Sequence, residues 1–231
     1  MRIRQVTLDT AGARLPDLAE FYGSRLGLPV AEADEVLVVS LADSQLAFRQ
    51  SPAADPFYHF AILVPGNRFD AASEWLAERA ELLADPQTGE KRFDFSAWDA
   101  YACYCHDPAG NIVELISLAG IGEGAAREGG FSADELLEIA EIGFVGHETA
   151  EMAAALAGLD IEIWDGTVDE PGRLAFAGER GRSIILSPTG RGWLPTGRPA
   201  EVHPADIVVA AAGRRQVTLP RVPYTVREAA G

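Results

Sequence analysis

Glu114 stands in the middle of an apolar run, HDPAGNIVELIS, that extends from His106 to Ser117. Burying a carboxylate without a partner is costly, so an acid in such a run either has a partner or serves chemistry. Side chains alternate between the two faces of a strand. If Val113 and Leu115 pack against helices, Glu114 faces the concave side of the sheet.

His59 is the second candidate, because it lies in a similar apolar strand, FYHFAILV. Alternation places His59 where it can meet Glu114. Neutral imidazole and carboxylate suit divalent first-row metals such as Fe, Mn, Ni or Zn. The same pair can also satisfy itself through a charge-assisted hydrogen bond, without metal or catalysis. Both interpretations stay open on the sequence.

The strands that would hold these residues belong to a repeated unit of one strand, one helix and further strands. The first copy is predicted as a strand over 3–9, a helix from 15 that ends at Gly27, and strands over 36–41 and 45–50. The second copy is predicted as a strand over 57–64, a helix over 70–81, and strands over 98–105 and 112–118.

A Gly-rich stretch follows the two copies, and a third, shorter copy follows that stretch. We predict paired modules over 1–118, a linker over 119–134, and a third partial module with extra strands over 135–231. Its elements are strands over 136–145, 161–164, 173–177, 183–186, 206–211 and 216–219, and a helix over 149–156 with Thr149 as N-cap. The glycines of the linker open no helix, so no nucleotide cofactor is expected.

Overlaying the copies extends the candidate metal site. Gln5 takes the position of His59, Ala47 takes that of Glu114, and in the third copy Glu141 takes that of His59. An amide oxygen can coordinate a metal whereas a methyl group cannot. The predicted metal ligands are therefore His59, Glu114 and Gln5, with Glu141 interpreted as a relic of the same position.

Further residues are predicted to line the same cavity. Glu114 and Tyr101 are the candidate catalytic residues, with Glu114 as a general base whose pKa is raised by burial. The candidate substrate-binding residues are Arg49, Gln45, Cys103 and Trp98. A guanidinium at Arg49 would favour a carboxylate or enolate, unless Arg49 lies on an exposed strand end.

The motifs LAEFYGSRLGLPV, FYHFAILVP and WDAYACYCHDPAGNIVELI resemble the vicinal oxygen chelate superfamily, which includes glyoxalase I, extradiol dioxygenases and bleomycin-resistance proteins. The later GRGWLPTGRPA is similar to a branch with a third partial module. The resemblance implies an α+β fold in which paired βαβββ modules form a curved, half-barrel-like mixed sheet around a cavity. It also implies a divalent metal bound by residues from the first and last strands of the modules.

Composition restricts the partners. The chain of 231 residues is 48% hydrophobic and carries 35 acidic against 19 basic residues, a net charge of −16. That balance disfavours nucleic acid and anionic membranes, and no apolar run reaches the length of a membrane span. We expect a cytoplasmic protein that binds a small molecule, and a homodimer, because a half module exposes sheet edges that need cover.

Two functions follow from these residues. In the first, a metal on His59 and Glu114 polarises adjacent oxygens of a small substrate, as in isomerases, lyases or dioxygenases. In the second, the same cavity sequesters an aromatic or drug-like ligand without metal. The loss of an acid at Ala47 favours the second, and the retention of His59 with Glu114 favours the first.

Overall fold

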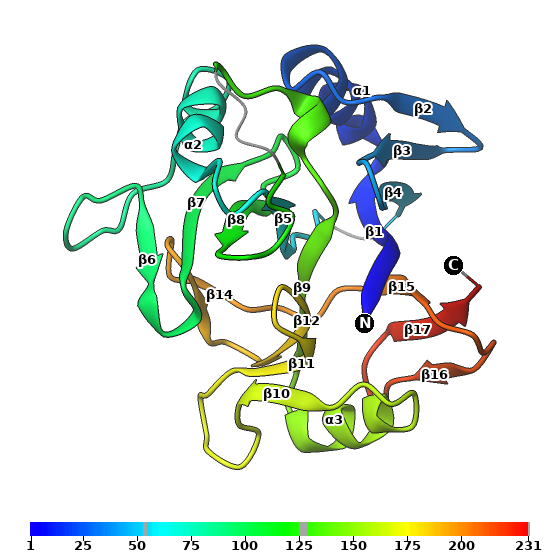
Figure 1. Cartoon of the computed structure of the whole chain (residues 1–231). Helices are drawn as coiled ribbons and strands as arrows, with labels where there is room; N and C mark the ends of the chain where they lie inside the picture. Colours follow the sequence, from blue (N-terminus) through cyan, green and yellow to red (C-terminus); the bar gives the residue numbers. More distant parts are fainter. Residues whose placement is uncertain (53–54, 125–128, 231) are drawn as a thin grey trace.

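The computed structural model describes residues 1–52, 55–124 and 129–230 and contains the repeated unit predicted from the sequence (Figure 1). The first copy comprises β1 (Arg2–Ala11), the helical turns η1 (Gly12–Arg14), α1 (Leu15–Ala19) and η2 (Glu20–Arg25), then β2 (Val30–Ala33), β3 (Val36–Ser40) and β4 (Gln45–Ser51). The second comprises β5 (His59–Val64), α2 (Phe69–Ala77), β6 (Phe93–Phe95), η3 (Ser96–Trp98), β7 (Ala100–His106) and β8 (Ile112–Leu118).

The remaining chain contains a third copy and a set of strands without a helix. The third copy comprises η4 (Ala133–Glu135), β9 (Ile139–Gly146), α3 (Thr149–Ala157), β10 (Ile163–Gly166), β11 (Ala175–Glu179) and β12 (Arg182–Pro188). The last strands are β13 (Gly192–Trp193), β14 (Arg198–Pro199), β15 (Ala205–Ala210), β16 (Gln216–Thr218) and β17 (Tyr224–Ala229).

Two large mixed sheets organise these copies. Sheet A has the order β16-β17-β15-β1-β4-β3-β2, and sheet B has the order β10-β11-β12-β9-β5-β8-β7-β6. The predicted α+β class with curled, half-barrel-like mixed sheets is confirmed. The combination of copies differs from the prediction, however, since the first two copies belong to different sheets. The second copy joins the third through β5 and β9, and the first joins the last strands through β1 and β15.

The local predictions differ from the structure mainly at element ends. β8 has the predicted bounds, whereas β2, β6, β13, β14 and β17 were not predicted. β2 is exposed throughout and lacks the apolar alternation that marks a strand. Thr149 is the first residue of α3 and not its cap, because Glu148 holds the N-cap position without a side-chain hydrogen bond. Gly27 ends the first helical segment with φ of 79°, a conformation that glycine adopts without steric cost.

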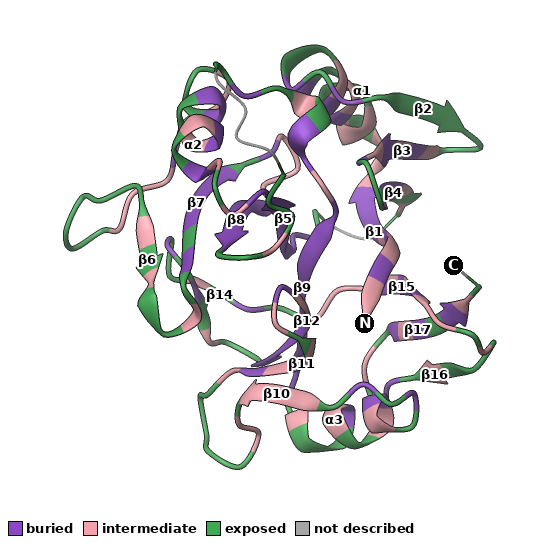
Figure 2. Cartoon of the chain, viewed as in Figure 1, coloured by how far each residue is buried: buried purple, intermediate pink, exposed green. Residues whose placement is uncertain are grey.

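The main hydrophobic core lies between the helices and the sheet faces that they cover. It includes Leu18 and Tyr22 near α1, Trp75 of α2 and Leu156 of α3, packed with side chains from both sheets. Figure 2 shows the resulting burial: β5, β8 and β9 are buried along their length, whereas β2 is exposed. A second, smaller core lies on the opposite face of sheet B and includes Phe57, Tyr104 and Trp193.

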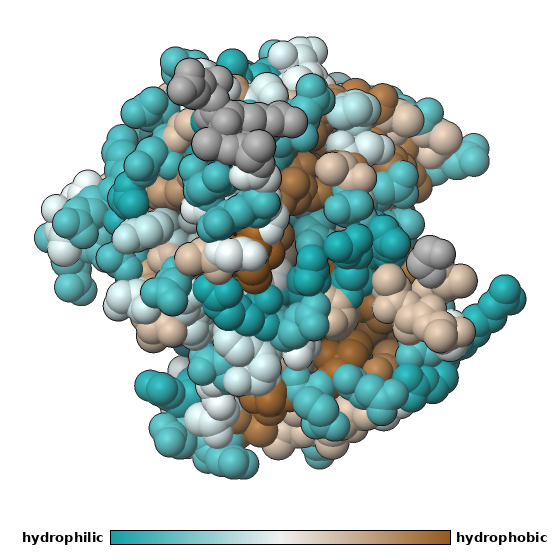
Figure 3. Space-filling model, in the orientation of Figure 1, coloured by the Kyte–Doolittle hydropathy of each residue, from teal (hydrophilic) through white to brown (hydrophobic). Residues whose placement is uncertain are grey.

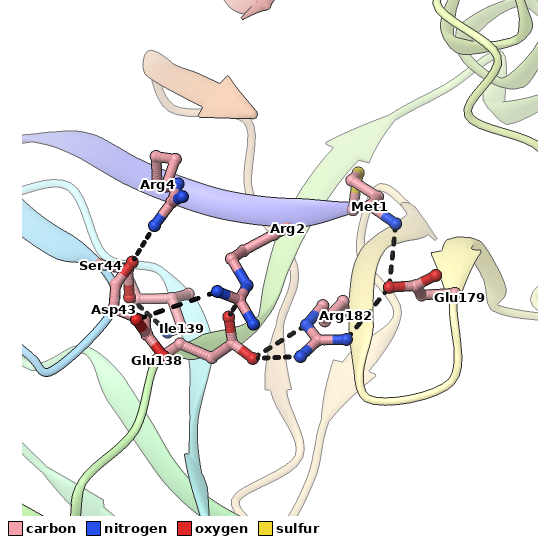
Figure 4. Close-up of polar contacts among 9 residues, drawn as sticks. All are labelled: Met1, Arg2, Arg4, Asp43, Ser44, Glu138, Ile139, Glu179 and Arg182. Carbon is pink, nitrogen blue, oxygen red and sulfur yellow. Dashed lines mark hydrogen bonds and ion pairs between the residues drawn. The ribbon is translucent and has the colours of Figure 1, made fainter. Parts of the chain in front are cut away.

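Charged side chains join the two sheets near the start of β1 (Figure 4). Glu138 is 2% exposed, and its carboxylate forms ion pairs with Arg2 at 3.3 Å and with Arg182 at 2.8 Å. The hydroxyl of Ser44 accepts a hydrogen bond from the backbone N–H of Ile139 at 2.7 Å. Because a buried acid held by two guanidinium groups is expensive to separate, this cluster fixes β1 against the start of β9.

Other predictions on organisation are only partly addressed. The described parts of the predicted linker contain no helix or strand before Ala133, and residues 125–128 lie outside the described residues. The half module that motivated the homodimer is paired within the chain through β5 and β9, so the homodimer and the domain bounds stay predictions.

None of the described helices is long and apolar enough to cross a membrane. The face in Figure 3 is mainly hydrophilic.

Candidate functional site

Three acid-base side chains share the inner face of sheet B, the face opposite α2 and α3. Ala61 in the middle of β5 pairs with Glu114 of β8 on one side and with Glu141 of β9 on the other. Paired residues on neighbouring strands point to the same face, and two strand spacings separate these carboxylates by roughly 10 Å at the backbone. The small Ala61 side chain leaves the space between them open. His59 lies two residues earlier on β5 and shares this face.

A rigid turn sets the position of Glu114. Asp107 is buried; its Oδ1 accepts the N–H groups of Ala109 at 2.9 Å and Asn111 at 3.0 Å. Its Oδ2 accepts the hydroxyl of Tyr22 at 2.9 Å. The side-chain oxygen of Asn111 accepts the N–H of Tyr58 at 2.9 Å. The DPAGN turn is therefore a structural anchor, which ties β8 to β5 and to the first copy.

His59 and Glu114 are in contact and almost fully buried. Nε2 of His59 lies 3.4 Å from Oε2 of Glu114, and Nδ1 lies 3.3 Å from the carbonyl oxygen of Ile112. A carbonyl can only accept, so in the neutral ring the proton belongs on Nδ1 and Nε2 presents a lone pair to Glu114. Two facing lone pairs repel. The contact is favourable only with a proton or a cation between them.

Glu141 has no partner for its charge. It is 4% exposed, and no hydrogen bond or ion pair to its side chain is found within the described parts of the chain. Burial raises the pKa of Glu141 well above its ordinary value of 4.5, and the neighbouring charge of Glu114 raises it further. Buried carboxylates are normally paired or bind metal, so the uncompensated acid makes this face the candidate functional site.

Aromatic side chains close a cavity of about 100 Å³ over these acids. The ring of Trp193 lies 4.9 Å from that of His59, and Trp98 packs edge-on against Phe176 with ring centroids 4.6 Å apart. The other lining residues are Phe95, Tyr104, Ile116, Leu174, Ile185, Arg191 and Leu194. Burial raises the pKa of Tyr104 well above its ordinary range, with further contributions from Glu114 and Glu141. The site thus combines apolar walls with a polar floor.

Three of the predicted site residues, His59, Glu114 and Trp98, line this cavity. Gln5, Gln45 and Arg49 do not, because β1 and β4 belong to sheet A. The Gln5 amide donates to Thr7 at 3.1 Å, and Gln45 is exposed. Arg49 instead binds the carboxylates of Asp9 and Asp206 in sheet A. The predicted ligand set of His59, Glu114 and Gln5 is therefore not brought together.

Tyr101 and Cys103 are also absent from the cavity, because they face α2. Tyr101 lies 5.7 Å from the ring of Phe69, and Cys103 belongs to the main core, where burial raises its thiol pKa to about 12. It is Tyr104 that pairs opposite Glu114. A shift of one residue moves every side chain of a strand to the other face, and this is how the prediction for β7 failed.

Sequence reasoning missed Tyr104, Trp193 and Arg191 and gave Glu141 too little weight. Glu141 was recognised as the third-copy counterpart of His59, so the signal was present. Combining the second copy with the third, instead of the first, would have found it. Trp193 and Arg191 lie in GRGWLPTGRPA, a segment after the third copy that the sequence marked only as a family-like motif. It carries no strand pattern that would place these two residues at the cavity.

The donors on this face suit a divalent cation only in part. An imidazole and two carboxylates are appropriate ligands, and Glu141 is a buried acid that lacks a counter-charge. Ile185 of β12 holds the position that matches Glu114 and cannot coordinate. As the side chains stand in the described ranges, no three His, Cys, Asp or Glu groups are close enough together to hold a metal ion.

Comparison with known proteins supports the fold. No family model and no curated protein sequence matches the chain. A candidate dioxygenase from Bacillus subtilis superposes with a TM-score of 0.61 at 13% identity, over 99% of this chain and 85% of that one. Glyoxalase I from Zea mays superposes with a TM-score of 0.57 at 11% identity, over 98% and 91%. The chain has the vicinal oxygen chelate fold. At 13% and 11% identity, this likeness establishes the fold alone. Any activity has to be inferred from the residues of the site.

Proposed function

We propose that the chain is a vicinal oxygen chelate enzyme in which His59, Glu114 and Glu141 bind a divalent metal ion, such as Fe, Mn, Ni or Zn, and act on a small oxygenated molecule. The observation that carries the proposal is the uncompensated Glu141 carboxylate, buried beside a second carboxylate. The likeness in fold to a candidate dioxygenase and to a glyoxalase I supports isomerase, lyase or dioxygenase chemistry.

Charge supports a cation on this floor. Two buried carboxylates repel each other, and the imidazole of His59 presents a lone pair to one of them. Protonation can relieve the repulsion at the cost of carboxylate character, whereas a divalent cation relieves it for all three groups. The N–H on Nδ1 of His59, held by the carbonyl of Ile112, is the second hydrogen bond that metal-binding histidines usually make.

The residues of this chain have separate tasks in such a reaction. A bound divalent ion would polarise adjacent oxygens of the substrate and stabilise developing negative charge. Glu114 is placed to take or return a proton at the floor of the cavity, and the Tyr104 hydroxyl stays protonated beside it as a donor. Trp98, Phe176 and Trp193 exclude water and so strengthen electrostatic interactions inside.

A second function, metal-free binding of a small aromatic ligand, is favoured by a different observation. Ile185 stands where a fourth donor would be expected, and five aromatic rings, those of Phe95, Trp98, Tyr104, Phe176 and Trp193, line the cavity. In that case Glu141 would be protonated and would donate a hydrogen bond to the ligand. The two functions differ in whether a cation is needed.

Metal content separates them. Protein purified without chelators would be analysed for metals as the natural chain, as His59→Ala and as Glu141→Gln. Gln5→Ala is the matched control, because Gln5 holds in sheet A the position of His59. We expect near-stoichiometric metal in the natural chain and the control, and loss of about 100-fold in metal affinity in either site variant.

Thermal unfolding with added Mn²⁺, Ni²⁺ or Zn²⁺ is an independent measurement. A metal that binds only the folded state raises the melting temperature, and we expect that rise in the natural chain and in Gln5→Ala only. If no divalent ion is retained and none raises the melting temperature, the metal proposal is wrong, and metal-free binding becomes the function to pursue.

A further inference from the structure

Arg191 lies where the acid-lined cavity meets a neighbouring hollow. The two share a wall made of Leu174, Phe176 and Arg191, and the neighbouring hollow is also lined by Arg173. The cavity therefore carries opposite charges at different places: Glu114 and Glu141 with the imidazole of His59 on its floor, and the guanidinium of Arg191 where it meets the neighbouring hollow. A small ligand would be oriented by such a gradient.

The guanidinium of Arg191 is held in place without an acidic partner. Its Nε donates to the carbonyl oxygen of Gly172 at 3.2 Å and its Nη1 donates to that of Gly192 at 3.0 Å. Nη2 makes no hydrogen bond to any residue that the structure describes, and no carboxylate there lies within ion-pairing distance of Arg191. Burial lowers the pKa of Arg191, and the positive charge of Arg173 adds to this effect.

An anion would remove this imbalance. A guanidinium fixed by backbone carbonyls loses little rotamer freedom when it binds a carboxylate, and charge-assisted hydrogen bonds are stronger than neutral ones. Asp165 also lines the neighbouring hollow, so the favourable place for an anionic group is on Arg191 itself, at the cavity end. The acids at the floor would repel the same group.

The size and lining of the cavity limit the remainder of the ligand. Apolar cavities of about 150 Å³ bind benzene, and the cavity here has about 100 Å³ with an open end. Aromatic faces prefer stacked or edge-on rings, and Trp98, Phe176 and Trp193 provide both. A single ring is therefore the largest group that the cavity can take, and it must extend into the open end, whereas a fused polycyclic compound exceeds the available space.

We infer that the ligand is a single-ring aromatic carboxylate, with the ring between Trp98, Phe176 and Trp193, the carboxylate on Arg191 and an oxygen substituent toward His59 and Glu114. This inference rests on the proposed function in taking the cavity as the reaction site. The recognition of ring and carboxylate, however, needs no metal, so that it can be measured separately.

Benzoate and benzamide are suitable probes, because they have the same size and differ in charge. Binding would be followed by calorimetry and by tryptophan fluorescence on the full chain. We expect benzoate to bind at least tenfold more tightly than benzamide, with an affinity that falls as salt is added. Arg191→Gln should weaken benzoate about tenfold and leave benzamide within about twofold. Arg214→Gln, at an exposed arginine in the loop between β15 and β16, is the matched control and should change neither.

Three results would overturn the inference. The first is equal affinity for the two probes, and the second is full benzoate affinity in Arg191→Gln. The third is no benzoate binding at about 10 mM, a concentration tenfold above a Kd of about 1 mM. Metal content of the same Arg191→Gln protein distinguishes this failure from failure of the proposed function. If the natural chain does not bind benzoate while Arg191→Gln retains metal, only the proposed ligand class is contradicted. Natural protein that binds benzoate without retaining metal contradicts only the metal site.

Discussion

Sheets A and B share the same central pairing of strands, with seven strands in sheet A and eight in sheet B, but they differ in how charge is compensated. In sheet B, Ala61 is flanked by Glu114 and Glu141. In sheet A, Thr7 at the corresponding position is flanked by Ala47 and Asp206. Sheet A therefore has an alanine at one of the two acid positions and an acid at the other.

The acid that sheet A keeps is neutralised. Arg49 donates through Nε to Asp9 at 2.9 Å and through Nη1 to Asp206 at 3.0 Å. We call these three residues the sheet A ion cluster. Sheet B carries no basic residue that pairs with Glu141 among the residues described. The inner face of sheet A thus satisfies itself, whereas that of sheet B requires a proton, a cation or a ligand.

The covering of the two faces follows the same division. Trp98 and Trp193 cover the acids of sheet B, whereas Gln45 on the inner face of sheet A is exposed. A shared fold does not decide where function lies. In this chain the difference is in charge compensation and cover, and the comparison can be tested by changing either sheet.

The largest expected effect is the loss of stability on removing the guanidinium of Arg49 from the sheet A ion cluster. Arg49→Met leaves Asp9, whose side chain is 9% exposed, next to Asp206 without compensation. Breaking a buried pair from one side costs about 3 to 5 kcal/mol, and because Arg49 is 42% exposed we expect about 2 to 3 kcal/mol. Urea unfolding measures it. Unchanged stability, or a change in metal content, would break the division between the two sheets.

Neutralising Glu141 and neutralising Asp206, which hold corresponding positions, should change the free energy of unfolding in opposite directions. In metal-free protein at pH 7, Glu141→Gln removes a buried acid that has no partner and should stabilise the fold by about 1 to 2 kcal/mol. Asp206→Asn removes a partner of Arg49 and should destabilise it by about 0.5 to 1 kcal/mol, since that pair is partly exposed. Denaturant midpoints of the two variants decide. If both substitutions destabilise the fold, the charge of Glu141 is compensated in the folded protein, contrary to this expectation.

The stabilisation by Glu141→Gln should depend on pH. The pKa of Glu141 is raised in the folded state, so between 4.5 and that raised pKa the unfolded chain has lost a proton that the folded chain retains. Stability of the natural chain therefore falls as pH rises through this range, and is fully present below pH 4.5. The gain from Glu141→Gln should disappear near pH 4.5. A gain that is constant from pH 4.5 to 8 would assign it to packing instead of charge.

The sequence predicted those features that depend on one copy alone. His59 and Glu114 were predicted together because both lie in long regular strands of the second copy, where alternation suffices. Which copies share a sheet depends on pairing between distant segments, and local pattern carries no information on it. Gln5 and Arg49 were assigned to the cavity for this reason, although the fold class itself was predicted correctly.

The register of β7 was the finest detail that the sequence missed, and it gives the smallest expected effect. Trp98 and Tyr104 both line the cavity, and because they are six positions apart, strict alternation places Tyr104, and not Tyr101 or Cys103, on the face of Trp98. Tyr104 therefore faces Glu114, and Tyr101 faces α2. The two tyrosines differ only in face, so removing each hydroxyl tests the register directly.

We expect Tyr104→Phe to weaken metal affinity about fivefold, equivalent to about 1 kcal/mol, because Glu114 loses a neighbouring donor. Tyr101→Phe should leave metal affinity unchanged, since its ring lies against Phe69 and beneath Arg92, outside the cavity. Calorimetric titration with the metal found in the natural protein measures both, and melting temperatures check that each variant folds. Equal effects of the two substitutions would mean that the hydroxyl of Tyr104 does not act on the floor of the cavity, and that only the aromatic walls distinguish sheet B on this strand.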